Sequence, residues 1–284
     1  MNDAPVQPGM NDQNNRIDET LKRIRNRIVV FSGKGGVGKT TAAVNLAYSM
    51  VIKGQKTGLL DADITGPNVP KMIGLQGSPW VDGEKKNILP QEKNGLFVIS
   101  MAPLIPPDAP VIWRGPLRSG VISQFLSDVV WGDLDYLFAD LPPGTGDEVL
   151  TTAQKMRPRM AIVVTTPQEV ATADCRRAVN MAKKLTIPII GVIENMSGLS
   201  CPHCGKNIDL FGSGGGEKMA EEMGVVFLGR IPMDIETRSG ADAGSPIVLS
   251  SPESVTASAF TDIAKHIDRL VGIRDDSPAP QIIL

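Results

Sequence analysis

Short runs of apolar residues alternate with longer amphipathic segments along most of this chain. The apolar runs have the length and β-branched composition of buried strands, and they cover residues 28–32, 56–60, 96–101, 134–139, 160–165, 189–193 and 225–228. Segments with helical spacing follow several of them, as at 169–185 and in a closing helix at 252–270. Because parallel strands need crossover connections, this alternation predicts an α/β fold with a mostly parallel sheet and helices on both faces.

The two ends of the chain differ from its body in composition. Residues 1–15 are largely polar residues, glycine and proline, so we expect a disordered tail there. Residues 16–27 combine basic side chains with spaced apolar ones, which indicates a short amphipathic helix. Residues 273–284 are expected to form a loose tail. The 284-residue chain thus predicts a single domain at 16–272, with a polar loop at 196–212 inside it.

Two stretches of the middle region are rich in turn residues. Residues 76–95 contain several glycine-based turns, which predicts an excursion from the sheet. Residues 103–110 contain four prolines and are expected to form a loop. A helix is predicted to open at Trp113 and to run to about residue 130.

The stretch from Gly33 to Thr41 joins the first strand to the first helix and carries the Gly-x-x-x-x-Gly-Lys-Thr pattern of a phosphate-binding loop. Glycines let the backbone turn so that successive N–H groups face one anion, and the following helix adds its positive dipole end. In this motif Lys39 contacts the β- and γ-phosphates, and the Thr40 hydroxyl binds Mg²⁺. The residues expected to bind ATP in this loop are Gly33, Lys34, Gly35, Gly36, Val37, Gly38, Lys39, Thr40 and Thr41.

Aspartates follow two predicted strands at the edge of the sheet where the phosphate loop lies. Asp140 ends the strand at 134–139, which is the Walker B arrangement for holding Mg²⁺ directly or through water. Asp61 and Asp63 follow the strand at 56–60, in a segment that we interpret as switch I. We expect Asp61 to support the Mg²⁺ shell and Asp63 to act on the attacking water. One of the two can instead cap the next helix, and the pattern does not say which.

The loop that follows the strand at 189–193 contains a Cys-x-x-Cys pair, Cys201 and Cys204. This spacing lets two thiolates reach one metal centre. Since one chain supplies only two such ligands, a four-cysteine site requires a second chain, and it can hold a [4Fe–4S] cluster or a tetrahedral Zn²⁺. We expect His203 to be an exposed loop residue and Cys175, within a predicted helix, to be a small buried side chain.

The second lysine of the phosphate loop, Lys34, resembles the deviant loop of the family that contains MinD, ParA and the nitrogenase iron protein. That resemblance implies an ATP-dependent homodimer in which Lys34 contacts nucleotide phosphate across the interface and contributes to catalysis with Lys39. It also implies that Asp63 orients the attacking water and that Asn195 reads the adenine edge. The loop containing Pro232 and Asp234 is then expected to lie along the base.

A closer resemblance covers about residues 25–270. The segments Trp113-Arg114-Gly115-Pro116, 140–147 and Glu194-Asn195-Met196-Ser197, followed by Cys201-Pro202-His203-Cys204, are similar to the Mrp/ApbC family of iron–sulfur cluster carriers. The resemblance implies a slow ATPase that binds a labile [4Fe–4S] cluster between two subunits. It implies a cluster donor and recipient apo-proteins as partners. Because the N-terminal cysteine cluster of some relatives is missing, a second, more tightly held cluster is not expected.

Charge and hydropathy limit the remaining possibilities. The formal net charge of −2 offers no general electrostatic attraction for nucleic acid, and no run of 18 apolar residues indicates a membrane span. We therefore expect a cytoplasmic protein with neither a nucleic acid nor a membrane as partner. Two alternatives stay open: a spatial-organisation ATPase of the MinD or ParA type, and a P-loop ATPase with a structural zinc at its dimer interface.

Overall fold

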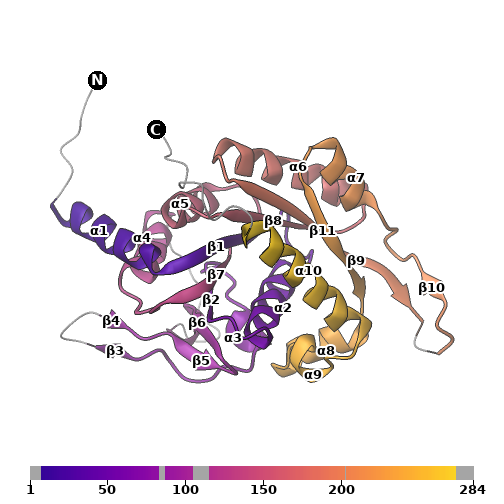
Figure 1. Cartoon of the computed structure of the whole chain (residues 1–284), viewed down its shortest axis with the longest axis horizontal. Helices are drawn as coiled ribbons and strands as arrows, with labels where there is room; N and C mark the ends of the chain where they lie inside the picture. The colour runs from indigo at the N-terminus through magenta and orange to yellow at the C-terminus, as the bar shows by residue number, and fades with distance from the viewer. Residues whose placement is uncertain (1–7, 83–86, 105–114, 202, 273–284) are drawn as a thin grey trace.

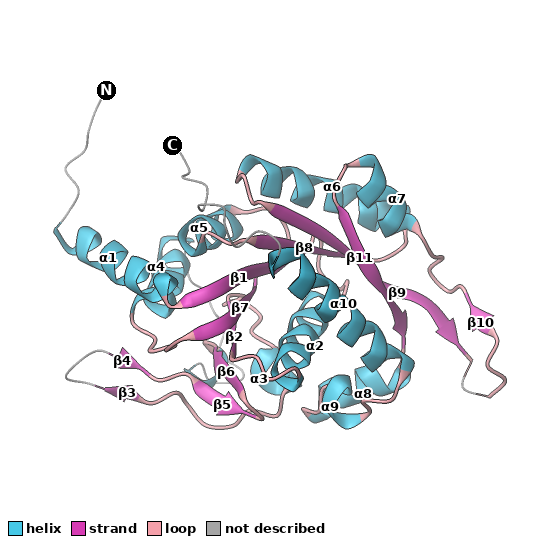
Figure 2. Cartoon of the chain, in the orientation of Figure 1, coloured by secondary structure: helices cyan, strands magenta, loops and turns pink. Residues whose placement is uncertain are grey.

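A computed structural model describes residues 8–82, 87–104, 115–201 and 203–272 of the chain. Within these residues, one large sheet runs through the molecule in the order β10-β9-β8-β1-β7-β2-β6-β5, and β11 pairs with β9 (Figures 1 and 2). Its parallel strands are β1 (Ile24–Phe31), β2 (Thr57–Asp61), β6 (Leu96–Ile99), β7 (Leu134–Asp140), β8 (Met160–Thr165), β9 (Ile189–Ser200) and β11 (Val226–Met233). The short antiparallel strands are β5 (Gln91–Lys93) and β10 (Asn207–Ile208), and a separate pair is formed by β3 (Val81–Asp82) and β4 (Asn87–Ile88).

Helices cover both faces of the sheet, and each face has its own hydrophobic core. The pleat of β1 shows why, because Ile28 and Val30 point into one core while Val29 and Phe31 point into the other. The first core is covered by α2 (Lys39–Ile52), α3 (Val69–Met72), α9 (Ile247–Ser250) and α10 (Val255–Gly272), with α8 (Ile235–Ala243) beside α3 and α9. The second is covered by α1 (Pro8–Lys22), α4 (Gly115–Ser127), α5 (Asp147–Met156), α6 (Glu169–Lys184) and α7 (Gly215–Glu222). The predicted α/β class is confirmed.

The N-terminal prediction needs a correction. Helix α1 begins at Pro8 and ends at Lys22, so a disordered tail over 1–15 is wrong for residues 8–15, and β1 already begins at Ile24. The amphipathic helix predicted at 16–27 is confirmed for residues 16–22, where Ile17 and Leu21 are spaced four apart and both are buried in the second core, and it is wrong for 24–27, which lie in β1.

Other boundaries also shift. The closing helix α10 begins at Val255, because the Ser254 hydroxyl accepts a hydrogen bond from the Ala257 amide and so caps it; Pro252 lies before the helix. The excursion at 76–95 contains β3, β4 and β5, with Ala102–Leu104 as a 3-10 turn after β6. Several predictions lie outside the described residues, namely those for 1–7, most of the proline-rich loop, Trp113, Arg114, Pro202 and the tail at 273–284.

The register of the sheet sets three strand ends side by side. Val30 of β1 and Asp61 of β2 are both register partners of Asp140 in β7. The phosphate loop leaves β1 directly after this row. The carboxyl ends of neighbouring parallel strands therefore bring the loop and both acidic segments to one edge of the sheet.

Candidate nucleotide and metal site

The phosphate loop occupies the turn between β1 and α2. Gly36 and Gly38 have φ values of 79° and 82°, in the region that favours glycine, so the turn depends on them. Helix α2 starts at Lys39, and Gly38 before it has no side chain with which to cap the helix. The first N–H groups of α2 are consequently available to an anion, as the motif predicts.

The start of the loop is fixed by close packing against α6. A Cβ atom added to Gly33 would lie 2.3 Å from the backbone carbonyl carbon of Asp174 and 2.6 Å from the amide nitrogen of Cys175. Cys175 is buried, and its thiol donates a hydrogen bond to the Val164 carbonyl oxygen at 3.5 Å. The prediction for Cys175 is therefore confirmed. Lys34, the next residue, is half-buried within the loop.

Lys39, Thr40 and Asp140 form one hydrogen-bonded group under the loop. The Lys39 ammonium nitrogen lies 2.6 Å from Asp140 Oδ1, and the Thr40 hydroxyl donates to Asp140 Oδ2 at 2.7 Å. The side chains of Lys39 and Asp140 are only 7% and 1% exposed, so this ion pair is shielded from water. A hydroxyl and a carboxylate side by side are oxygen donors suited to Mg²⁺, so the residues present fit that ion.

Asp61 and Asp63 lie close together but have different surroundings. Asp61 is buried and accepts hydrogen bonds from the Ser100 hydroxyl and from the backbone amides of Asp63 and Val69. Since Val69 begins α3, Asp61 is the aspartate that binds the start of the next helix. Burial and the neighbouring Asp140 raise the pKa of Asp61 to about 8. Asp63 is half-buried and accepts from the Thr65 hydroxyl and the Gly66 amide.

A cavity of about 410 Å³ opens beside the phosphate loop, between the ends of β9 and β11 and helix α8. Its lining includes five of the residues predicted to bind nucleotide, namely Gly38, Thr41, Asn195, Pro232 and Asp234. The Asn195 side-chain amide donates to the Val37 carbonyl oxygen at 2.8 Å, so it is fastened to the loop. Asp234 caps α8 by accepting from the Glu236 amide. The position and mainly apolar walls of the cavity suit a nucleotide base.

The two cysteines of the predicted metal loop lie in a hairpin between β9 and β10. Cys201 follows the last residue of β9, and its backbone pairs with that of Lys206 and Gly205 in a tight turn, with both hydrogen bonds at 2.9 Å. Cys201 is half-buried and Cys204 is exposed. The backbone amides of His203 and Cys204 lower the pKa of the Cys201 thiol, which favours the thiolate that binds metals. Figure 1 shows this hairpin projecting from the molecule.

One described chain does not complete a metal site by itself. No group of three or more His, Cys, Asp or Glu side chains within the described residues is placed to hold a metal ion. His203 is exposed, as expected for a loop residue.

Comparison with known proteins places this chain in a family. The family model for ParA-type NUBPL iron-transfer P-loop NTPases matches residues 23–268. The chain belongs to this family. It is 52% identical to an iron–sulfur cluster carrier protein of Methanocaldococcus jannaschii over 258 residues, which cover 90% of this chain and 88% of that one. It is 48% identical to the Pyrococcus furiosus carrier over 279 residues, with 94% of both chains covered.

Solved structures agree with that assignment. A nucleotide-binding protein of Archaeoglobus fulgidus in complex with ADP has a TM-score of 0.75 and 37% identity, over 87% of this chain and 96% of that one. The cell division ATPase MinD of Pyrococcus furiosus has a TM-score of 0.64 at 24% identity, over 86% and 99%, and supports the fold alone. No helix among the described residues of this P-loop NTPase is both long and apolar enough to cross a membrane.

Glu194 is a residue of this NTPase to which the sequence analysis gave no role. It is fully buried, and its carboxylate accepts from the Ser197 hydroxyl at 2.6 Å and from the amides of Gly214 and Gly216 at 2.9 and 2.6 Å. It therefore joins β9 to the start of α7. The signal in the sequence is an acidic residue at the end of an apolar strand together with glycines at 214–216, whose meeting depends on the tertiary fold.

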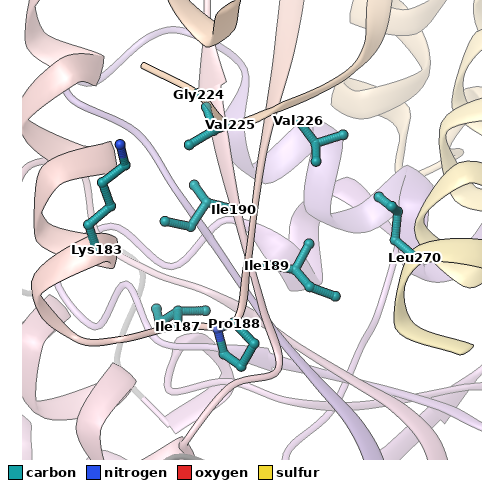
Figure 3. Close-up of a pocket in the computed structure, with 9 residues that line it drawn as sticks. All are labelled: Lys183, Ile187, Pro188, Ile189, Ile190, Gly224, Val225, Val226 and Leu270. Carbon is teal, nitrogen blue, oxygen red and sulfur yellow. The ribbon is translucent and has the colours of Figure 1, made fainter. Parts of the chain in front are cut away.

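A second cavity of about 410 Å³ lies at the opposite, amino-terminal ends of β9 and β11 (Figure 3). Its lining is aliphatic except for Lys183, whose ammonium group donates to the Met223 carbonyl oxygen at 2.6 Å. The other lining residues are Ile187, Pro188, Ile189, Ile190, Gly224, Val225, Val226 and Leu270. The phosphate loop and the cysteine hairpin lie at the other ends of the strands, so the chemistry of the NTPase is separate from this cavity.

Proposed function

We propose that this chain is an ATP-binding and ATP-hydrolysing iron–sulfur cluster carrier, which holds a labile [4Fe–4S] cluster between two subunits and transfers it to apo-proteins. The observation that carries the proposal is that β9 leads from the nucleotide cavity at Asn195 directly into the hairpin of Cys201 and Cys204. A phosphate-binding site and a thiolate pair thus share one structural element. The names of the relatives support the same cargo.

The nucleotide chemistry follows from the group under the phosphate loop. Lys39 binds the β- and γ-phosphates, and Thr40 and Asp140 hold Mg²⁺, which when bound neutralises phosphate charge. Asp63 is half-buried and follows two residues after Asp61, the register partner of Asp140, and it orients the attacking water. Lys34 contacts phosphate across the subunit interface and contributes to catalysis. These residue roles are predictions. They serve an ATP hydrolysis that we propose to be slow and coupled to cluster carrying.

The cluster requires a homodimer. Two cysteines from each subunit make a four-cysteine site, and a protruding hairpin with the exposed side chain of Cys204 is accessible to its counterpart. Two exposed apolar side chains follow the cysteines in the chain, Ile208 in β10 and Leu210 just after it. Exposed apolar side chains near the cysteines favour association with a second copy. A cluster donor and recipient apo-proteins are the further partners.

A structural zinc is the second candidate for the cysteine site, because Zn²⁺ takes the same four thiolates. In that case the metal only fastens the subunits, and the chain is a P-loop ATPase without cargo. A spatial-organisation ATPase of the MinD or ParA type leaves the cysteine hairpin without a use.

Anaerobic reconstitution separates these possibilities. The wild-type protein is incubated with iron and sulfide, and iron, sulfide and zinc are counted per dimer beside optical and Mössbauer spectra. The proposal predicts about four irons and four sulfides per dimer, absent from the Cys201→Ala/Cys204→Ala variant. Cys175→Ala is the matched control, because this thiol is buried away from the hairpin, and it is expected to retain the cluster. Zinc alone, with no cluster under any anaerobic condition, would contradict the carrier function.

A further inference from the structure

Strand β9 changes direction between the nucleotide cavity and the cysteine hairpin. Met196 has a φ of 57° and Gly198 a φ of 76°, so two residues of the strand adopt the left-handed region. For Met196, which carries a Cβ atom, this conformation is unfavourable by roughly 1–2 kcal/mol. Backbone strain of this kind persists only where the surrounding structure holds it.

The pairing with β11 shows the same interruption. Ile231 pairs with Asn195 and Met233 pairs with Leu199, so residues 196–198 stand opposite Pro232 alone. Proline has no N–H group with which to continue the ladder. Residues 196–198 therefore form a bulge, the β9 bulge, whose backbone is not held by regular strand pairing.

The β9 bulge lies between the contact with the phosphate loop and the cysteine hairpin, and residues on both sides of it line the nucleotide cavity. Asn195 before it contacts the phosphate loop through the Val37 carbonyl, and Met196 and Leu199 line the nucleotide cavity. Cys201 follows two residues after Leu199. A ligand in the cavity thus touches the segment that carries the cysteines.

Glu194 holds the β9 bulge from the other face of the sheet. Its carboxylate accepts from the Ser197 hydroxyl within the bulge and from the amides of Gly214 and Gly216 at the start of α7. The Arg230 guanidinium Nε lies 3.6 Å from the same carboxylate and provides a positive charge. These contacts compensate the burial of the Glu194 carboxylate. The hydrogen bond from the Ser197 hydroxyl connects the β9 bulge to that carboxylate.

We propose that the β9 bulge is a hinge through which nucleotide in the adjacent cavity repositions the cysteine hairpin, and that Glu194 is a positioning residue that sets the hinge through Ser197. The inference rests on the proposed carrier function and adds its regulation. A nucleotide that contacts Met196 and Leu199 differently in two hinge positions shifts the population between them.

The test uses metal-free protein, so it does not depend on cluster binding. The rate of alkylation of Cys204 by iodoacetamide is measured by peptide mass spectrometry without nucleotide, with Mg-ADP and with Mg-ATP. We expect nucleotide to change the wild-type rate by about fivefold or more, as for a typical coupled pair of sites. In Ser197→Ala the ratio is expected to fall toward one while the Kd for nucleotide stays within about twofold. Ser197→Thr, which keeps the hydroxyl, is expected to restore the wild-type ratio.

The matched control is Ser200→Ala, because the Ser200 hydroxyl donates within the hairpin to Asn207 and lies beyond the β9 bulge. It should leave the nucleotide effect unchanged. Ser197→Ala is preferred to a substitution of Glu194, since removing that buried carboxylate leaves its hydrogen-bond donors unpaired and can unfold the protein. The hinge is overturned if the wild-type alkylation rate of Cys204 is the same with and without nucleotide. It is also overturned if Ser197→Ala keeps the wild-type ratio of these two rates. Failure of cluster reconstitution, in contrast, overturns the carrier function and leaves this readout intact.

Discussion

Replacing Gly33 with alanine tests how tightly the phosphate loop is pressed against α6. The new Cβ atom would lie 2.3 Å from the carbonyl carbon and 2.5 Å from the carbonyl oxygen of Asp174. These are backbone atoms of a packed helix, so no change of rotamer relieves the contact. Overpacking of this kind costs about 1–3 kcal/mol, which corresponds to a fall of about 2–12 °C in Tm for a domain of this size.

Gly35→Ala is the matched control, because it lies in the same loop. The nearest atom to its added Cβ is Pro143 Cγ at 4.0 Å, an ordinary van der Waals contact, and its φ is not positive. We expect a change within about 0.5 kcal/mol. Both variants are compared with wild type by calorimetry and urea unfolding without nucleotide, because both residues adjoin the phosphates. If Gly33→Ala is as stable as Gly35→Ala, the close approach of loop and helix does not constrain the fold and our reasoning is wrong.

Three further predictions concern buried polar groups. Asp140→Ala leaves the buried Lys39 ammonium without its carboxylate, so urea unfolding of the nucleotide-free protein should show a loss of about 3–5 kcal/mol; a loss below 1 kcal/mol would mean that water screens the pair. Asp61 has a pKa raised to about 8, so its folded form binds the proton more tightly than the unfolded chain. Its contribution to stability therefore decreases as the pH rises from about 4 to about 8, and urea midpoints across this range should vary less in Asp61→Asn; equal slopes would refute this. Asn195→Ala leaves the Val37 carbonyl without its donor, which should lower the free energy of unfolding by about 1–3 kcal/mol. It should also weaken nucleotide binding in calorimetric titrations, and an unchanged Kd would show that Asn195 is not part of the nucleotide site.

The elements built on local patterns were predictable from the sequence. The phosphate loop follows from its glycine and lysine spacing, and the buried runs before Asp140 and at 160–165 have the composition of central strands. The Cys-x-x-Cys spacing predicted a metal loop from local sequence alone; the structure shows that a tight turn brings the two cysteines into one hairpin, and metal binding there stays a prediction. In these cases the signal lies within a few neighbouring residues, so no tertiary information was needed.

The remaining features depend on contacts between distant segments. The carboxylate of Glu194 is buried where α7 begins with glycines that approach it closely; a Cβ atom on Gly216 would lie 3.1 Å from Glu194 Cβ and 3.2 Å from its Oε2. The extension of β9 to Ser200 depends on pairing with β10 and β11. The spaced apolar residues Ile17 and Leu21 predicted the second half of α1, and both pack into a core that the other helices build. Its first half, at residues 8–15, has a polar composition that gave no helical signal.

The most direct test of the carrier function is transfer of the cluster to a recipient. Reconstituted protein is mixed anaerobically with an apo-enzyme that needs a [4Fe–4S] cluster for activity, in the presence of a chelator that captures free iron. The proposal predicts that enzyme activity returns despite the chelator, and that the Cys201→Ala/Cys204→Ala variant treated in the same way restores none. Activity that returns only when the chelator is omitted, or that does not return at all, would show that the cysteine hairpin does not deliver a cluster.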